Sequence, residues 1–310
     1  MPLEPHVKRF LDLLSAGNPP DARGISVEER RRGLAELMKL AGPEISVGRV
    51  ENRMIPGPGG ALPVRIYSPL NAAAQQPALI YLHGGGLVAG SIATHDPIAR
   101  ALVNSGAVRI ISVDYRLAPE HRFPAALQDA MAATQYVSTH PAEFGIDASR
   151  LGLCGDSAGG TLVAAICQAQ ARAGGPPLAL QLLICPILDY SRATPSKRAL
   201  ANGYLIDQAT LDHDLMHYLP EGTDPSDPRI SPLLADAVTG LPRTIIHTAE
   251  FDPLCDEGRY YFERLKRAHN EVSYTCHPGM IHLFYGLGAV IPYARKAFEQ
   301  IGGEIRAALA

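Results

Sequence analysis

A serine flanked by glycines follows an apolar run near the middle of the chain. Residues 151–154 form the run, Ser157 lies between Gly155 and Gly159, and an Ala-rich helical pattern continues to Ala173. A strand, a sharp turn and a helix are the setting in which G-x-S-x-G exposes a nucleophilic serine above a sheet. The flanking residues must be small, because a serine held at positive φ brings the chain close on both sides. A glycine-rich turn without chemistry is the alternative, so Ser157 needs partners elsewhere in the chain.

An acid for such a site is expected at the carboxyl end of a parallel strand, where the reactive groups of α/β sheets collect. Asp252 follows the apolar run 244–248 and falls in the loop after it. Asp256 opens the next helical pattern, where a carboxylate commonly caps the helix or interacts with its dipole. The positions therefore favour Asp252 as the acid that orients a base.

Three histidines late in the chain are candidates for the base that activates Ser157. His269 ends an exposed helical pattern, His277 finishes a strand-like run, and His282 falls in the loop after that run. The loop position at a strand's carboxyl end favours His282 over the other two. The order Ser157, Asp252, His282 is the one expected for an α/β-hydrolase triad.

A second glycine cluster, His83-Gly84-Gly85-Gly86, directly follows the apolar run 78–82. Acyl transfer passes through an alkoxide, which backbone N–H groups stabilise only where no side chain blocks their approach. We expect the N–H groups of Gly84 and Gly85 to point inward and that of Ala158 to supply a third donor. No His/Asp/Glu cluster shows metal-ligand spacing, so we expect no metal.

The elements that must position these residues follow from the periodicity of the apolar residues. Continuous apolar runs separated by helical patterns predict a mostly parallel sheet of about eight strands, covered by helices on both faces. The predicted strands are 49–55, 62–68, 78–82, 109–113, 151–154, 180–185, 244–248 and 271–276. The predicted helices that alternate with the later strands are 96–104, 125–139, 158–173, 256–268 and 293 to the C-terminus.

Two segments outside this alternation predict a helical cap. Helical patterns at 4–16 and 26–40 precede every strand, the second opening with a capping box at Ser26 and Glu29. The arginine run 30–32 is interpreted as a solvated helix face. The long interval after Leu188 holds a helix near 208–218 capped by Asp207. We therefore predict N-terminal cap helices in 1–45, a first core part in 46–188, a cap insertion in 189–232 and a second core part in 233–310, with the cap closing over Ser157.

Composition restricts the function further. The net charge of −3 across 310 residues gives no basic footprint for nucleic acid. No apolar run reaches the roughly 18 residues that a membrane span needs, and no signal peptide is visible at the N-terminus. The five cysteines show no C-x-x-C spacing and lie mostly in apolar runs, which favours buried free thiols and a cytoplasmic protein.

The chain resembles bacterial carboxylesterases of the hormone-sensitive-lipase-like family of α/β-hydrolases. Its matching stretches are His83–Gly86, 114–126 with Asp-Tyr-Arg-Leu-Ala-Pro-Glu-His, 155–160, Asp252–Leu254 with Asp256–Gly258, and Gly279–His282. The resemblance implies hydrolysis of carboxylic esters with short or medium acyl groups, no cofactor, and a small-molecule ester as substrate. Leu87 departs from the aromatic residue that commonly follows the glycines, and with Asp156 it is assigned to the substrate pocket.

Two other functions remain open at this point. One is an amidase or peptidase on the same fold. The other is a ligand-binding receptor, because plant gibberellin receptors resemble this family but lack the catalytic histidine. The sequence also leaves open whether two copies form a homodimer.

Overall fold

An eight-stranded sheet forms the centre of the computed structural model, which describes residues 2–17 and 21–310. The strand order is β1-β2-β4-β3-β5-β6-β7-β8, and β2 alone runs against the rest. The strands are β1 Arg49–Gly57, β2 Gly60–Ser68, β3 Gln76–Leu82, β4 Arg109–Val113, β5 Ile146–Asp156, β6 Leu180–Ile184, β7 Arg243–Phe251 and β8 Val272–Ile281. The prediction of a mostly parallel sheet of about eight strands is confirmed.

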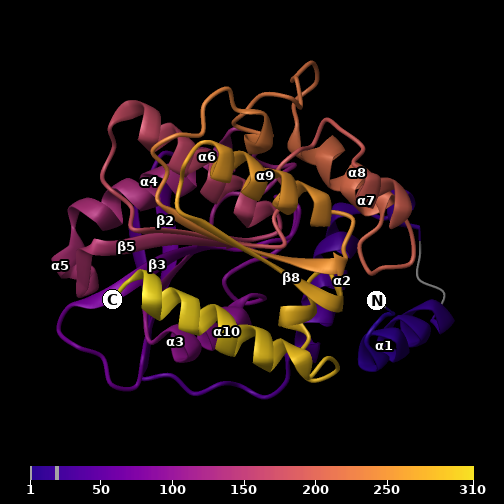
Figure 1. Ribbon diagram of the computed structural model, residues 1–310, viewed down its shortest axis with the longest axis horizontal. Coiled ribbons are helices and arrows are strands. Elements are labelled where there is room, and N and C mark those ends of the chain that lie inside the picture. Colours follow the sequence, from indigo (N-terminus) through magenta and orange to yellow (C-terminus); the bar gives the residue numbers. More distant parts are fainter. Residues whose placement is uncertain (1, 18–20) are drawn as a thin grey trace.

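Helices cover both faces of this sheet (Figure 1). On one face lie α4 (Ala125–Thr139), α6 (Ala158–Ala173) and α9 (Cys255–Arg267), and on the other lie α3 (Asp96–Gly106) and α10 (Tyr293–Ala308). Each face has its own hydrophobic cluster, with Leu162 and Leu265 in one and Leu102 and Ile301 in the other. The central strands β3 and β6 are buried on both faces, which is why they read as continuous apolar runs.

The remaining helices lie around this core or at the carboxyl end of the sheet. They are α1 (Pro5–Ala16), α2 (Val27–Met38), the short α5 (Pro141–Phe144) and α7 (Pro195–Ala199), and α8 (Gln208–Tyr218), with 3-10 turns at Ala22–Gly24, Lys39–Ala41, Pro232–Leu234 and Phe284–Gly286. The capping box of α2 and the Asp207 cap of α8 form as predicted. Within the described residues, no helix is long and apolar enough to cross a membrane.

The two N-terminal helices have different neighbours, although their sequence patterns predict the same cap role for both. Helix α1 buries Val7 and Phe10 in the cluster that contains Met280 and Ile281, and the Glu4 N–H donates to the Gly279 carbonyl at 3.1 Å. Helix α2 instead lies across from α8 above the strand ends. The expectation that both helices close the pocket is therefore wrong for α1, because its apolar stripe is covered by the end of β8.

The arginine run in α2 is not a solvated face. Arg30 and Arg31 have side chains that are 15% and 35% exposed and are both ion-paired, and only Arg32, at 61%, is solvated. Arg31 donates to the carbonyls of Val88 and Ala118 and pairs with Glu120, whose pKa it lowers to about 2. The run therefore fastens α2 to the core. The division of the chain at residues 45, 188 and 232 stays a prediction.

The C-terminal end of the chain lies at the opposite end of the sheet from α2 and α8 (Figure 1). Helix α10 runs back along the sheet, and near its end the Ala307 carbonyl accepts a hydrogen bond from Arg243 at 3.5 Å. Because Arg243 begins β7, the chain ends beside the amino ends of the parallel strands.

Candidate active site

Ser157 occupies a strained turn between β5 and α6. Its backbone angles are φ 51° and ψ −122°, a region that side chains rarely adopt and that marks functional sites. A Cβ on Gly155 would overlap the backbone of Gly159, and one on Gly159 would overlap the Leu82 carbonyl. The Ser157 N–H also donates to the Ile184 carbonyl at 2.9 Å. The glycines of the motif are thus required by the close passage of the chain.

Three side chains from separate strand ends form one hydrogen-bonded series. The Ser157 Oγ lies 3.1 Å from His282 Nε2, and His282 Nδ1 lies 2.7 Å from Asp252 Oδ2. The second carboxylate oxygen of Asp252 accepts the Leu254 N–H at 2.8 Å. Asp252 directly follows β7 and His282 directly follows β8, so both side chains lie at the carboxyl edge where β5 places Ser157. If His282 donates from Nδ1 to the carboxylate, its Nε2 accepts the serine proton.

The other two candidate histidines have different surroundings. His277 is buried, with Nε2 at 3.0 Å from His247 Nδ1 and Nδ1 at 3.2 Å from the Tyr293 hydroxyl. Burial, with His247 beside it, lowers the pKa of His277 to about 3. His269 is exposed just after α9. Asp256, in the first turn of α9, accepts the Ser196 N–H and pairs with Arg259.

The glycine loop after β3 corrects one predicted oxyanion donor. The Gly84 N–H donates to Asp156 Oδ1 at 3.0 Å, so it is not free to bind an oxyanion. Gly85 and Gly86 follow at φ 116° and 68° and line the pocket beside Ser157. Ala158 is the first residue of α6, where an N–H has no partner within the helix. Among the described hydrogen bonds none is donated by the N–H of Gly85, Gly86 or Ala158, which leaves these three as candidates.

The buried carboxylate of Asp156 holds this glycine loop through hydrogen bonds. Besides the Gly84 N–H, its carboxylate accepts hydrogen bonds from Tyr81 at 2.5 Å and Tyr285 at 3.2 Å, and His95 Nε2 lies 3.7 Å away. Complete burial raises the pKa of Asp156, although the Tyr81 hydrogen bond opposes the shift. Burial disfavours the charged form of His95 as well, and it therefore lowers the pKa of this imidazole to about 4. Asp156 is among the residues that line the pocket, and its contacts hold the loop in place; its role toward substrate stays a prediction.

Leu87 does not lie in the pocket. It is fully buried, has φ 64°, and belongs to the hydrophobic cluster that includes Val88 and Val113. Its carbonyl accepts the Ala118 N–H at 2.9 Å. The expected pocket role is corrected: Leu87 packs the glycine loop against the core.

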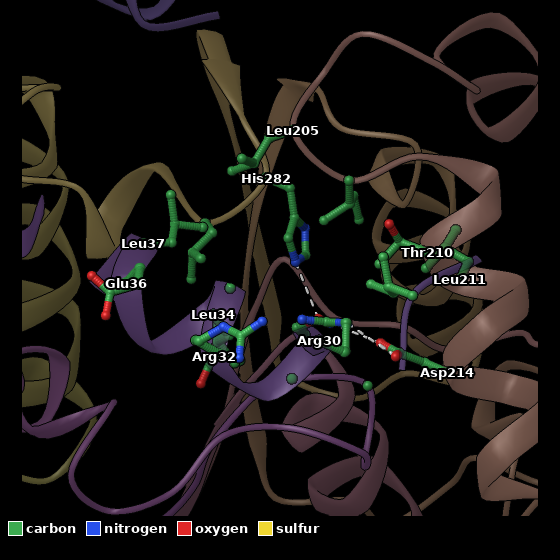
Figure 2. Close-up of a pocket in the computed structure, with 18 of the residues that line it drawn as sticks. Arg30, Arg32, Leu34, Glu36, Leu37, Leu205, Thr210, Leu211, Asp214 and His282 are labelled. Carbon is green, nitrogen blue, oxygen red and sulfur yellow. Dashed lines mark hydrogen bonds and ion pairs between the residues drawn. The ribbon is translucent and has the colours of Figure 1, made fainter. Parts of the chain in front are cut away.

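A cavity of about 490 Å³ opens above Ser157 (Figure 2). Helices α2 and α8 form two of its walls, and Arg30 and Asp214 point toward each other between them. Most of the lining surface is apolar, and its large apolar side chains are Ile25, Leu34, Leu37, Ile187, Leu205, Ile206, Leu211 and Leu283. The charged residues Glu29, Arg32 and Glu36 also line it, with side chains at least half exposed. The cavity suits a small, mainly apolar ligand.

Two groups near the site were not found from the sequence. Cys185, buried at φ 45°, lies with its thiol against Asp252, and burial with this carboxylate raises the thiol's pKa. Cys185, Asp252 and His282 have ligand-type atoms within 4.8 Å of one another, but the last two are already engaged with each other and with Ser157. We therefore assign this cluster to the serine site rather than to a metal. All five cysteines are free thiols, three of them buried.

The second group is a buried ion pair that holds the insertion to α9. Lys197 Nζ lies 2.6 Å from Glu257 Oε1, and Glu257 Oε2 accepts the N–H groups of Leu188 and Asp189. Burial raises the pKa of Glu257, with Lys197 opposing the shift. The stretch Asp256–Gly258 carries part of the family resemblance, but no spacing indicates the distant Lys197.

Comparison with known proteins agrees with this geometry. A family model of the alpha/beta hydrolase fold matches residues 79–286. The chain belongs to the α/β-hydrolase family. It is 40% identical over 262 residues to the carboxylic ester hydrolase LipN of Mycobacterium tuberculosis, covering 83% of this chain and 69% of LipN. It is 37% identical to carboxylesterase NlhH of the same species, covering 95% and 92% of the two chains.

A solved structure shows the same likeness in three dimensions. The ester-hydrolase EH1AB1 from the metagenome of Lake Arreo matches with a TM-score of 0.95 and 40% identity, over 98% of both chains. Its structure was solved as a complex with a derivative of bipyridine phosphonate. The resemblance of this α/β-hydrolase to the hormone-sensitive-lipase-like carboxylesterases is thus confirmed.

Proposed function

We propose that this α/β-hydrolase is a serine carboxylesterase that hydrolyses short- to medium-chain acyl esters through an acyl-enzyme. The observation that carries the proposal is the unbroken series from Ser157 Oγ through His282 to Asp252, with contacts of 3.1 and 2.7 Å at the floor of an apolar cavity. The relatives named as ester hydrolases support the choice of ester as substrate.

The chemistry follows from the roles of the three groups. His282 takes the Ser157 proton as Oγ attacks the ester carbonyl, and Asp252 stabilises the imidazolium that forms. The N–H groups of Gly85, Gly86 and Ala158 receive the developing oxyanion. His282 then gives its proton to the leaving alcohol, and water repeats the sequence on the acyl-enzyme.

The cavity supports the chain-length expectation. A volume of about 490 Å³ with walls made by α2 and α8 accommodates a small ester, whereas a long acyl chain would have to leave through the opening. The complete Ser-His-Asp series is also what a ligand-binding receptor of this fold would not need. Nothing in the geometry favours amides over esters, so amides belong in the test.

The test joins active-site labelling to substrate comparison. We expect a serine-directed phosphonate to label Ser157 alone, and Ser157→Ala to lose nearly all hydrolysis of 4-nitrophenyl butyrate. Acetate, butyrate, octanoate and palmitate esters should be hydrolysed with the highest kcat/KM among the shorter three, and the matched anilides far more slowly. Labelling at another residue, or full turnover by Ser157→Ala, would overturn the mechanism; faster anilide hydrolysis would identify an amidase.

A further inference from the structure

A buried ion pair crosses the wall of the cavity from α2 to α8 (Figure 2). Arg30 Nε donates to Asp214 Oδ1 at 3.1 Å, and Arg30 Nη2 donates to Asp214 Oδ2 at 2.8 Å. The two side chains are only 15% and 7% exposed. Bidentate arginine–carboxylate contacts of this kind are among the strongest polar interactions, and burial shields them from water. Both residues line the cavity that contains Ser157.

The carboxylate of this pair lies directly against the loop assigned to the oxyanion. A Cβ built on Gly86 would overlap the Asp214 carboxyl group, so the two are already in contact. Asp214 is therefore a negative charge placed next to an N–H group that must itself receive negative charge. His213 Nδ1, 3.2 Å from Asp214 Oδ1, is the other titratable group beside it. The charged residues Glu29, Arg32 and Glu36 are at least half exposed and are screened by solvent.

An unpaired carboxylate at this place would oppose the reaction. Like charges a few ångströms apart in a partly buried site repel strongly, and the repulsion exists only once the oxyanion forms. Arg30 cancels the charge of Asp214. The neighbouring Arg31 keeps α2 in place by binding the Val88 and Ala118 carbonyls, so Arg30 is presented from a helix already fixed to the core.

We propose that Arg30 is a positioning residue that neutralises Asp214, and that this pair makes the pocket selective for uncharged esters. The proposal rests on the proposed esterase function. With the pair intact, the wall beside the reacting carbonyl carries no net charge, and Arg32, which also lines the cavity, is solvent-exposed and lies 4.0 Å from Glu29. An ester bearing a free carboxylate therefore finds no unpaired buried cation beside Ser157. The substrate class that follows is neutral esters, with half-esters of dicarboxylic acids rejected.

The test compares variants that leave one charge or none in the wall. Arg30→Met leaves Asp214 alone, Asp214→Asn leaves Arg30 alone, and the double variant Arg30→Met/Asp214→Asn leaves neither. Diethyl adipate and monoethyl adipate are matched substrates, because they differ in one ester replaced by a carboxylate. We expect Arg30→Met to lower kcat on the diester by about 10- to 100-fold with a smaller change in KM. The double variant should recover most of that kcat.

Asp214→Asn leaves a positive charge, instead of a negative one, beside the glycine loop. Because the charge left beside the loop is positive, its kcat on the diester should fall much less than that of Arg30→Met, and its kcat/KM on the half-ester should rise at least tenfold relative to wild type. Arg30→Lys, which keeps the charge but not the bidentate geometry, should retain more of the wild-type kcat than Arg30→Met does. If the pair only latches α2 to α8, both single variants and Arg30→Lys lose activity alike and the double variant is no better. That outcome would overturn the proposal.

Two measurements separate this proposal from the esterase assignment. Phosphonate labelling of Ser157 and the melting temperature are recorded for every variant, with Arg295→Met as a control that removes one exposed charge from α10. If wild type is not labelled or does not cleave the diester, the proposed function has failed. If labelling and diester hydrolysis are normal but Arg30→Met behaves like Asp214→Asn, the charge role alone has failed. If Arg30→Met does not fold, Arg30→Lys and Asp214→Asn still decide the question.

Discussion

Asp156 shows how a single buried carboxylate prepares a loop for chemistry. Fully buried, it accepts hydrogen bonds from the Gly84 N–H and from the hydroxyls of Tyr81 and Tyr285. Anchoring the first glycine fixes the start of the loop from which Gly85 and Gly86 line the pocket beside Ser157. The residue between Gly155 and the nucleophile therefore supports, through the backbone it holds, the loop that we propose binds the oxyanion.

Substitution of Asp156 should separate anchoring from charge. Asp156→Ala leaves three donors buried without an acceptor, and we expect kcat to fall by about 100-fold or more and unfolding free energy by about 2–5 kcal/mol. Asp156→Asn keeps one acceptor oxygen and should lose about tenfold or less in kcat. Steady-state kinetics and urea unfolding of both variants test this, with Tyr285→Phe as the loss of one donor. Equal kcat in Asp156→Ala and wild type would contradict the anchoring role.

Substitution of His282 should affect turnover, whereas substitution of His277 should affect the free energy of unfolding. His282→Ala should lower kcat by about 10⁴-fold or more, as removal of a triad base does. His277→Gln should keep kcat within a few-fold, because its partners are His247 and Tyr293 and not the serine. Its unfolding free energy should fall by about 1–3 kcal/mol. A large kcat loss in His277→Gln with normal folding would mean that the His247–His277 contact serves catalysis.

At the residue scale the sequence identifies the reacting groups better than their supports. Ser157, Asp252 and His282 were selected from motif and strand-end position, and the structure brings them together. Gly84 was misassigned because three consecutive glycines look alike until the acceptor of each N–H is known. No local sequence pattern indicates the roles of Arg30, Asp214 and Cys185, because each role depends on a partner that is distant in the chain.

At the element scale the two N-terminal helices should differ in their effect on substrate choice. Leu34, on α2, lines the cavity and packs near Gly85, whereas Phe10, on α1, is buried away from it. We expect Leu34→Ala to raise the octanoate-to-butyrate ratio of kcat/KM by widening the cavity. Phe10→Ala should leave that ratio unchanged while lowering unfolding free energy by about 3–5 kcal/mol.

Ester panels and denaturant unfolding of the two variants provide the measurement. A changed acyl preference in a folded Phe10→Ala variant would show that α1 acts on the pocket after all.

The elements themselves were predictable from periodicity, and α4, α6 and α8 have the predicted bounds. The surfaces against which these elements pack were not predictable. An amphipathic pattern shows that α1 must bury an apolar stripe, but it does not show which apolar surface covers that stripe. The short α5 and α7 offer too few turns for a periodic signal.

At the scale of the whole molecule, buried neutral histidines should make the fold sensitive to mild acid. Burial lowers the pKa of His83 and His95 to about 4 and that of His277 to about 3. Between about pH 6.5 and 4 the unfolded chain binds protons that the folded chain does not. Stability should therefore fall as pH falls through this window, by up to about 1.4 kcal/mol per pH unit for each histidine.

Urea unfolding at pH 7.5, 6 and 5 measures this dependence. In His277→Gln one of the three contributions is absent, so its stability should fall less steeply with acid even though it starts lower at pH 7.5. A wild-type stability that does not change between pH 7 and 5 would contradict the burial-driven shifts.

The fold class was predictable from the alternation of apolar runs and helical patterns, whereas this acid response depends on which histidines the tertiary packing buries.

The return of α10 along the sheet decides how the enzyme can be attached to a solid support. The chain ends near Arg243, at the amino ends of the strands, whereas α2 and α8, which line the cavity, lie at the opposite end of the sheet (Figure 1). A linker at Ala310 therefore holds every molecule with its cavity-lining helices away from the support. A linker before Glu4 would pull on the backbone that donates to Gly279, three residues from His282. Immobilised enzyme should thus retain more of its turnover when tethered through the C-terminus.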